Sequence, residues 1–168
     1  MSEFDTLEFE EVEVPRVLAA QMPGAVGPDP AAIAGAMRTA FTELVAFVRQ
    51  LKLSPSGPPR VMYMAHGPQG VRFTAAMPIA APPASTRMIG PGFVKPIQAA
   101  RAMRFTHRGS YSELSKTYAR ITEFLKAKGL IKTDAEWARY MPMWEEYLND
   151  PQTTPPEELR THIYLPMT

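Results

Sequence analysis

The chain of 168 residues contains no cysteine, which excludes disulfide bonds, catalytic thiolates and cysteine-ligated metal sites. It also lacks an excess of one charge, because 18 Lys and Arg residues stand against 17 Asp and Glu residues. The resulting net charge of +1 removes global charge as an argument for nucleic-acid binding. No stretch approaches the roughly 18 uninterrupted apolar residues of a membrane span.

The N-terminal segment lacks the features of a secretory signal. Six acidic residues and no Lys or Arg precede Arg16, whereas a signal peptide has a basic start followed by an apolar stretch. We therefore expect a cytoplasmic protein without membrane contact. The apolar share of 45% and the charged share of 21% predict a single compact domain over residues 1–168.

Sequence patterns for metal and nucleotide sites are missing as well. His66, His107 and His162 lack a His-x-x-x-His spacing, and the glycine patterns of phosphate-binding loops are absent. We expect no metal, no cofactor and no direct nucleic-acid binding. Although His107 could act as a base, no Asp or Ser partner is placed beside it, so we interpret it as a packing or hydrogen-bonding residue.

Two helices are marked by their capping residues and apolar stripes. Asp29 is a candidate N-cap for the first helix, whose apolar stripe covers residues 33–51. The second helix is expected to begin at Ser110, which forms a capping box with Glu113, and to end at Gly129. Many of the 18 prolines gather in clusters between these elements, so the chain divides at those clusters.

Several segments have the alternation or the β-branched and aromatic composition of strands. The first is expected over residues 11–22, continuing past Pro15. The acidic start of this segment is either a tail or a paired edge strand. The other predicted strands cover residues 60–64, 71–77, 99–106, 143–148 and 161–165.

The chain also shows a weak internal repeat. Residues 41–48 align with residues 118–125 at a shift of 77 positions, and residues 72–78 align with residues 160–166 at a shift of 88 positions. The order in each half is strand, helix, strand, strand. Two similar units are therefore expected to pair about a pseudo-two-fold axis.

These halves cover about residues 11–80 and 97–168, with a proline-rich connector at 78–96 and an insertion at 131–141. The predicted fold is α+β, in which duplicated β-α-β-β units form one antiparallel sheet with two main helices on one face. The two helices do not cover the other face of the sheet or the groove between the halves, so either surface could be the ligand-binding site.

The strand predicted over residues 143–148 carries the strongest candidate functional residue, Glu145. Alternation places Glu145 and Tyr147 on one face and Trp144 and Glu146 on the other. A carboxylate beside a tyrosine can attract a cation or orient water, although a solvated residue on a half-exposed strand is the ordinary alternative. Aromatic residues that could share a cavity with it, or belong to the core, are Tyr63, Phe73, Phe105, Tyr111, Trp137, Tyr140 and Tyr164.

A basic stretch over residues 87–132 holds ten Lys and Arg residues and two acids. Nucleic acid or an acidic protein partner could use such a stretch, but charged faces are usually solvated. No helix-turn-helix or single-strand-binding motif accompanies it.

Short motifs in a fixed order resemble the GyrI-like small-molecule-binding domain, which is also the effector-binding half of AraC-type and MerR-type multidrug regulators. They are His107-x-Gly109-x-Tyr111 before the second helix, Glu145-x-Tyr147 in the strand, and a closing segment at 158–166. The resemblance extends from residue 12 to residue 167. It implies that the sheet curves around a central ligand groove.

The resemblance further implies that Glu145 is a buried acid that pairs with cationic, lipophilic compounds. It places Tyr111, Tyr147 and Tyr164 along the groove, and Tyr63 and Trp144 are further wall candidates, although alternation points Trp144 away. Because only about a dozen residues precede the first predicted strand, we expect a free-standing sensor half without a DNA-binding domain.

Three functions remain open. The first is a sensing or sequestering module that binds small amphipathic molecules. The second is a hydrolase of cyclopropane-containing alkylating compounds, in which Glu145 would act as general base and Tyr147 or Tyr111 would donate or orient a proton. Trp137 and Trp144 would offer flat stacking surfaces for the substrate, and the insertion that carries Trp137 and Tyr140 favours this function. The third is a protein-interaction module that resembles gyrase inhibitors and uses the basic stretch or the strand edges instead of the groove.

Overall fold

The computed structural model describes residues 7–83 and 90–167, which form eight strands, two α-helices and three short 3-10 helices. The strands and α-helices are β1 (Glu8–Val14), β2 (Val17–Val26), α1 (Pro30–Gln50), β3 (Arg60–Gly67), β4 (Gly70–Pro78), β5 (Phe93–Ile97), β6 (Ala100–Arg108), α2 (Leu114–Ala127), β7 (Met143–Tyr147) and β8 (Arg160–Pro166). The 3-10 helices are η2 (Tyr111–Glu113), η3 (Asp134–Tyr140) and η4 (Pro156–Glu158).

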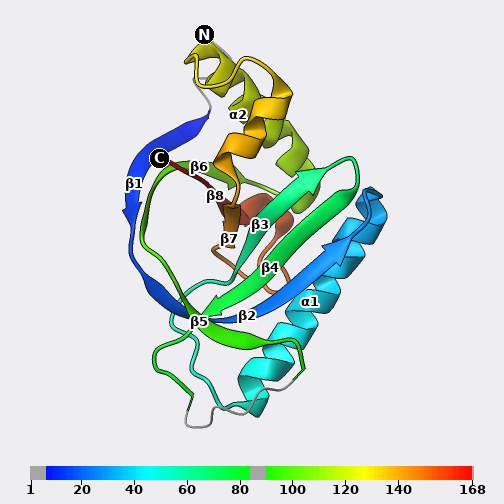
Figure 1. Cartoon of the computed structure of the whole chain (residues 1–168), viewed down its shortest axis with the longest axis vertical. Coiled ribbons are helices and arrows are strands. Elements are labelled where there is room, and N and C mark those ends of the chain that lie inside the picture. The colour runs from blue at the N-terminus through cyan, green and yellow to red at the C-terminus, as the bar shows by residue number, and fades with distance from the viewer. Residues whose placement is uncertain (1–6, 84–89, 168) are drawn as a thin grey trace.

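All eight strands belong to one antiparallel sheet with the order β1-β6-β8-β7-β3-β4-β2-β5. Figure 1 shows this sheet curling into a half-barrel. The predicted α+β class is thereby confirmed. Each β-α-β-β unit contributes three adjacent strands, and the units meet where β3 pairs with β7. A common origin of the two units stays a prediction.

Helix α1 begins as its capping residue predicts, because the Asp29 carboxylate accepts a hydrogen bond from the Ala32 amide at 3.0 Å. Its buried residues, which include Leu44 and Phe47, pack toward β2 and β4. By length and a mean hydropathy of 1.4, α1 would also pass as a membrane span. This is a weak indication, since the core helix of a soluble protein passes the same test.

Helix α2 begins later than predicted, and the predicted capping box is wrong. The 3-10 turn η2 precedes α2, so Ser110 lies outside its first turn and caps nothing with its side chain. Its hydroxyl instead meets the Ser112 hydroxyl at 2.8 Å, and the Glu113 carboxylate pairs with Lys116 at 2.6 Å. Beyond the end of the helix, Gly129 has a φ of 72°, the left-handed conformation expected of a residue that ends a helix.

The continuous strand predicted over residues 11–22 is wrong. The chain leaves the sheet at Pro15 and Arg16, so β1 pairs with β6 while β2 lies between β4 and β5, toward the opposite end of the sheet. The connector predicted over 78–96 also contains most of an additional strand, β5. Its Pro96 has no N–H group to donate, which an edge strand tolerates. The other predicted strands correspond to β3, β4, β6, β7 and β8.

Two of the three buried apolar clusters of the described residues lie on the helix-bearing face of the sheet. One lies under α1 and contains Leu44 and Phe73, and the other lies under α2 and contains Phe105 and Ile163. Tyr63 of β3 packs against both clusters. The seam between the two units is therefore the place where polar side chains from both can meet.

Candidate functional site

Glu145 lies at this seam, in the middle of β7. Its register partners are Val61 of β3 and Ile163 of β8, both fully buried, so its side chain is on the helix-bearing face. Only 4% of Glu145 is exposed. A carboxylate so poorly solvated needs polar partners to be stable there.

Three tyrosine hydroxyls supply these partners, each from a different element. Tyr63 of β3 donates to Oε1 at 2.9 Å, Tyr147 of β7 donates to the same oxygen at 2.7 Å, and Tyr118 of α2 donates to Oε2. Within residues 7–83 and 90–167, no Lys, Arg or His forms an ion pair with Glu145. The acidic group is thus held by neutral donors alone.

The three tyrosines remain protonated in this setting. Burial raises the pKa of Tyr63, Tyr118 and Tyr147 well above the ordinary value of 10, and the charge of the Glu145 carboxylate raises it further. Each hydroxyl is therefore a lasting hydrogen-bond donor near neutral pH.

Apolar and aromatic side chains surround the three tyrosines. On the side of α1, the ring of Phe41 meets Tyr147 edge-on at 5.9 Å, and the Met37 sulfur lies 3.9 Å from the Tyr63 hydroxyl. Tyr111 of η2 contacts Tyr147 in the same edge-on manner at 5.6 Å. Three tyrosines that the sequence analysis predicted as site residues are thus close together, namely Tyr63, Tyr111 and Tyr147.

On the side of α2, Trp137 of η3 lies 6.0 Å from the ring of Tyr118. Its indole N–H donates to the Thr122 hydroxyl at 3.0 Å, which orients the ring. Tyr140 and Phe105 are buried in the apolar cluster under α2, and neither has a polar contact with Glu145. Trp137 is therefore near the site, whereas Phe105 and Tyr140 contribute to the core beneath it.

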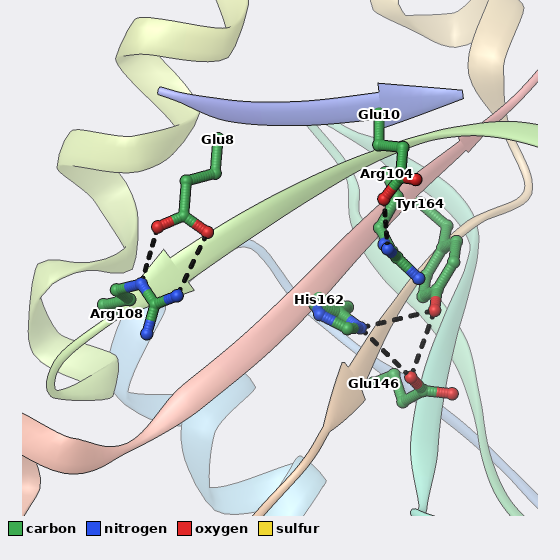
Figure 2. Close-up of polar contacts among 7 residues, drawn as sticks. All are labelled: Glu8, Glu10, Arg104, Arg108, Glu146, His162 and Tyr164. Carbon is green, nitrogen blue, oxygen red and sulfur yellow. Dashed lines mark hydrogen bonds and ion pairs between the residues drawn. The ribbon is translucent and has the colours of Figure 1, made fainter. Parts of the chain in front are cut away.

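Two residues of the predicted wall lie on the opposite face of the sheet. Trp144 and Tyr164 are register partners and stack at 5.0 Å with an angle of 11° between their rings. The Tyr164 hydroxyl donates to Glu146 at 3.1 Å (Figure 2). The expectation that Tyr164 lines one groove with Glu145 is therefore not met, because its place opposite Trp144 puts it on the other side.

Tyr118 was missed as a partner of the acidic residue. In the sequence it belongs to the apolar stripe of the second helix, and its hydroxyl is the only sign of a polar role. Met37 and Phe41 were likewise assigned to the stripe of the first helix. The apolar stripe of a helix shows which side of the helix is buried, but it does not show which residues of β7 that side contacts.

His107 has a structural role, in line with its interpretation as a hydrogen-bonding residue. It is buried, with Nδ1 2.6 Å from the Thr117 hydroxyl oxygen and Nε2 2.9 Å from the Ser110 carbonyl oxygen. In the described part of the chain, no group of three or more His, Asp and Glu residues is arranged to hold a metal ion.

The basic stretch is partly neutralised from within the protein. Arg87 lies outside the described residues, but three arginines of β6 pair with glutamates of the edge strand β1. The pairs are Glu11 with Arg101 at 2.9 Å, Glu10 with Arg104 at 2.5 Å and Glu8 with Arg108 at 2.6 Å. From Glu8 onward the acidic segment is thus a paired strand, which leaves less basic surface for a protein partner.

Comparison with known proteins defines the class. The model of the GyrI-like small molecule binding domain matches residues 40–168, and the chain belongs to this family of ligand-binding domains. The predicted resemblance is thereby confirmed. No curated protein sequence matches the chain.

Solved structures share the fold at low sequence identity. The C-terminal domain of EcmrR matches with a TM-score of 0.69 and 14% identity, over 96% of this chain and 97% of that one. In an EcmrR–DNA complex the TM-score is 0.74 at 14% identity, over 95% of this chain, which spans 57% of the EcmrR chain.

Two further solved structures share the fold. SAV2435, solved with tetraphenylphosphonium, matches with a TM-score of 0.63 and 12% identity, over 96% of this chain and 94% of its own. A hydrolase from Listeria innocua matches with a TM-score of 0.58 and 16% identity, over 96% and 92%.

Proposed function

We propose that the protein binds small amphipathic cations at Glu145, as a sensing or sequestering module. The observation that carries the proposal is a carboxylate with 4% exposure whose only polar partners in the described chain are tyrosine hydroxyls. An uncompensated buried charge is costly, and a cation that replaces the missing counter-charge recovers part of that cost.

The hydrogen bonds also indicate what kind of cation suits the site. A carboxylate offers about four acceptor positions, and the tyrosines already occupy three of them. A cation with an apolar surface needs no hydrogen bonds from Glu145 and gains from the surrounding rings, at roughly 0.5–2 kcal/mol for each good cation–π contact. Tetraphenylphosphonium, bound to the similar SAV2435 structure, is a compound of this type.

Access to Glu145 requires that part of its wall moves, since the carboxylate is closed off from solvent. The side chains best suited to this are Met37, Phe41 and Tyr111, which are partly exposed and come from α1 and η2. Methionine repacks easily because its side chain is unbranched and flexible. We expect ligands to enter between these two elements.

The test is calorimetric titration of tetraphenylphosphonium into the wild type, Glu145→Gln and Glu146→Gln. The two variants make the same change at adjacent residues on opposite faces of β7, so Glu146→Gln is the matched control. We expect Glu145→Gln to weaken binding about 100-fold, or about 2.8 kcal/mol, and Glu146→Gln to change it less than about threefold.

Tetraphenylborate, which has the same shape and the opposite charge, separates charge recognition from apolar binding. It should bind far more weakly than the cation. The proposal is wrong if both ions bind alike, or if Glu145→Gln binds the cation as tightly as the wild type does.

A second candidate function is hydrolysis of cyclopropane-containing alkylating compounds. It is favoured by the proton donors beside Glu145 and by the similarity to a structure described as a hydrolase. Glu145 would orient a water as general base, while Tyr147 or Tyr118 would donate a proton to the opened ring. Mass spectrometry of such a compound incubated with wild type and Glu145→Gln decides between binding and turnover.

A further inference from the structure

The face of the sheet opposite Glu145 carries a row of polar side chains across five strands. Register pairs connect Glu8 of β1, Thr106 of β6, His162 of β8, Glu146 of β7 and Arg60 of β3 in that order. Within this row Glu146 lies between basic neighbours on both sides. The row therefore balances most of its charge internally.

The charges are not balanced two residues further along, at the next pair on this face, where Arg108 of β6 lies directly opposite Arg160 of β8. Like charges at directly opposed positions of adjacent strands are destabilising. Among the described residues, only the carboxylate of Glu8 forms an ion pair with either of these two arginines. It accepts hydrogen bonds from Arg108, from Nε to Oε1 at 2.6 Å and from Nη2 to Oε2 at 3.3 Å (Figure 2).

Arg160 is left without a dedicated partner. Over residues 7–83 and 90–167, its guanidinium forms no hydrogen bond or ion pair, although its charge reaches Glu8. The hydrogen bond from Arg108 lowers the pKa of Glu8, and the charge of Arg160 adds to that effect. Two cations thus share one surface carboxylate.

Both guanidinium groups border open space large enough for a small molecule. A surface groove of about 520 Å³ between β1, β6 and β8 has the lining residues Glu8, Glu10, Arg104, Arg108, Arg160 and His162. An adjoining groove of about 560 Å³ is also lined by Arg108 and Arg160, together with Glu157 and Glu158, which do not line the first groove. The like-charged pair therefore lies where the two grooves meet.

We propose that this groove binds a small oxyanion, a phosphate or carboxylate group, between Arg108 and Arg160. A guanidinium group offers paired N–H donors that match the oxygens of either anion. Arg104 is already engaged by Glu10 at 2.5 Å, so the unpaired Arg160 provides the free donors. The bound charge would also relieve the repulsion between the two arginines, while Glu8 would compete for Arg108.

The test is titration of inorganic phosphate, and separately of acetate, at constant ionic strength set with chloride. Binding is followed through the arginine Nε–H signals in proton–nitrogen NMR spectra. We expect saturable shifts that Arg160→Gln weakens by roughly tenfold or more. Arg49→Gln, the same change on the exposed side of α1, should leave the affinity within about twofold.

Glu8→Gln gives an opposite expectation, because it removes the internal carboxylate that competes for Arg108. Anion affinity should rise by about threefold or more in this variant. Arg160→Gln removes a like-charge contact and is expected to stay folded. The proposal is overturned if neither anion gives saturable shifts, or if Arg49→Gln weakens binding as much as Arg160→Gln. Stronger binding of phosphate or of acetate identifies the preferred group.

Discussion

Glu145 and Glu146 are adjacent carboxylates on β7, and they differ in the charge of their partners. Glu145 accepts hydrogen bonds from three neutral tyrosines. Glu146 lies 3.4 Å from His162 and 3.1 Å from the Tyr164 hydroxyl, and its register partner on β3 is the buried Arg60. Because side chains alternate along a strand, one step in sequence moves a carboxylate from one environment to the other.

The pKa of Glu146 reflects this difference. Burial by itself would raise it, but hydrogen bonds to His162 and Tyr164, with the charges of Arg60 and His162, hold the pKa below the ordinary value of 4.5. The protein itself therefore stabilises the anion at Glu146. At Glu145 the proposed function assigns that task to a ligand.

We expect the largest difference between the two carboxylates in the free energy of unfolding, when the charge of Glu146 or of Glu145 is removed. Glu146→Gln is expected to lower the free energy of unfolding by about 2–4 kcal/mol, because it leaves Arg60 buried without its counter-charge. Glu145→Gln should change it by less than about 1 kcal/mol, since it removes a charge that has no cationic partner. Urea unfolding of both variants measures the two values, and equal losses would contradict the comparison.

Removing one hydroxyl from each site sharpens the comparison. Tyr118→Phe takes away the one donor to Oε2 of Glu145 found among the described residues and should lower stability by about 1.5–3 kcal/mol. Tyr164→Phe leaves Glu146 with His162 and should lower stability by about 0.5–1.5 kcal/mol. Thermal unfolding of the two variants gives the ranking. A larger loss in Tyr164→Phe would mean that hydroxyl donors matter equally on both faces.

The lowered pKa of Glu146 predicts a pH dependence of stability. A carboxyl with a lower pKa in the folded state contributes stability above its unfolded pKa and loses it as the pH falls through the folded value. The stability difference between wild type and Glu146→Gln should therefore shrink as the pH falls below about 4.5. Unfolding curves between pH 7 and pH 3 measure it, and a constant difference would contradict the assignment.

The smallest expected effect is a change in tryptophan fluorescence when a ligand binds. The two tryptophans lie on opposite faces of the sheet, so each reports on one face. Trp137 lies 6.0 Å from Tyr118, whereas Trp144 stacks on Tyr164 across the sheet. Tetraphenylphosphonium should therefore change the fluorescence of Trp137 and leave that of Trp144 nearly constant. We expect Trp137→Phe to lose most of the response and Trp144→Phe to keep it. The reverse result would place the ligand on the other face.

The alternation of side chains along one strand was sufficient to predict which residues of β7 share a face with Glu145. The period of two in residues 143–148 separates Glu145 and Tyr147 from Trp144, and the structure has them on those faces. The face of Tyr164 depends on the register between β7 and β8, which joins residues about twenty positions apart. That register is a tertiary property, and no pattern within one strand contains it.

The strand ends were harder to predict than the helices. Asp29 marks the start of α1 correctly because a capping interaction involves only neighbouring residues. Residues 11–14 alternate and the strand pattern continues to residue 22, but the two parts of this segment join different neighbours in the sheet. The pairing of β1 with β6 joins residues about ninety positions apart, such as Glu11 and Arg101, and is therefore a property of the folded chain.

The closed position of Glu145 has a consequence for binding kinetics under the proposed function. If a wall must open before a cation reaches the carboxylate, the observed association rate should level off at high ligand concentration instead of rising linearly. The limiting rate would then be a property of the protein, shared by cations of different size. Dissociation would pass the same barrier, so a tightly held ligand would leave slowly.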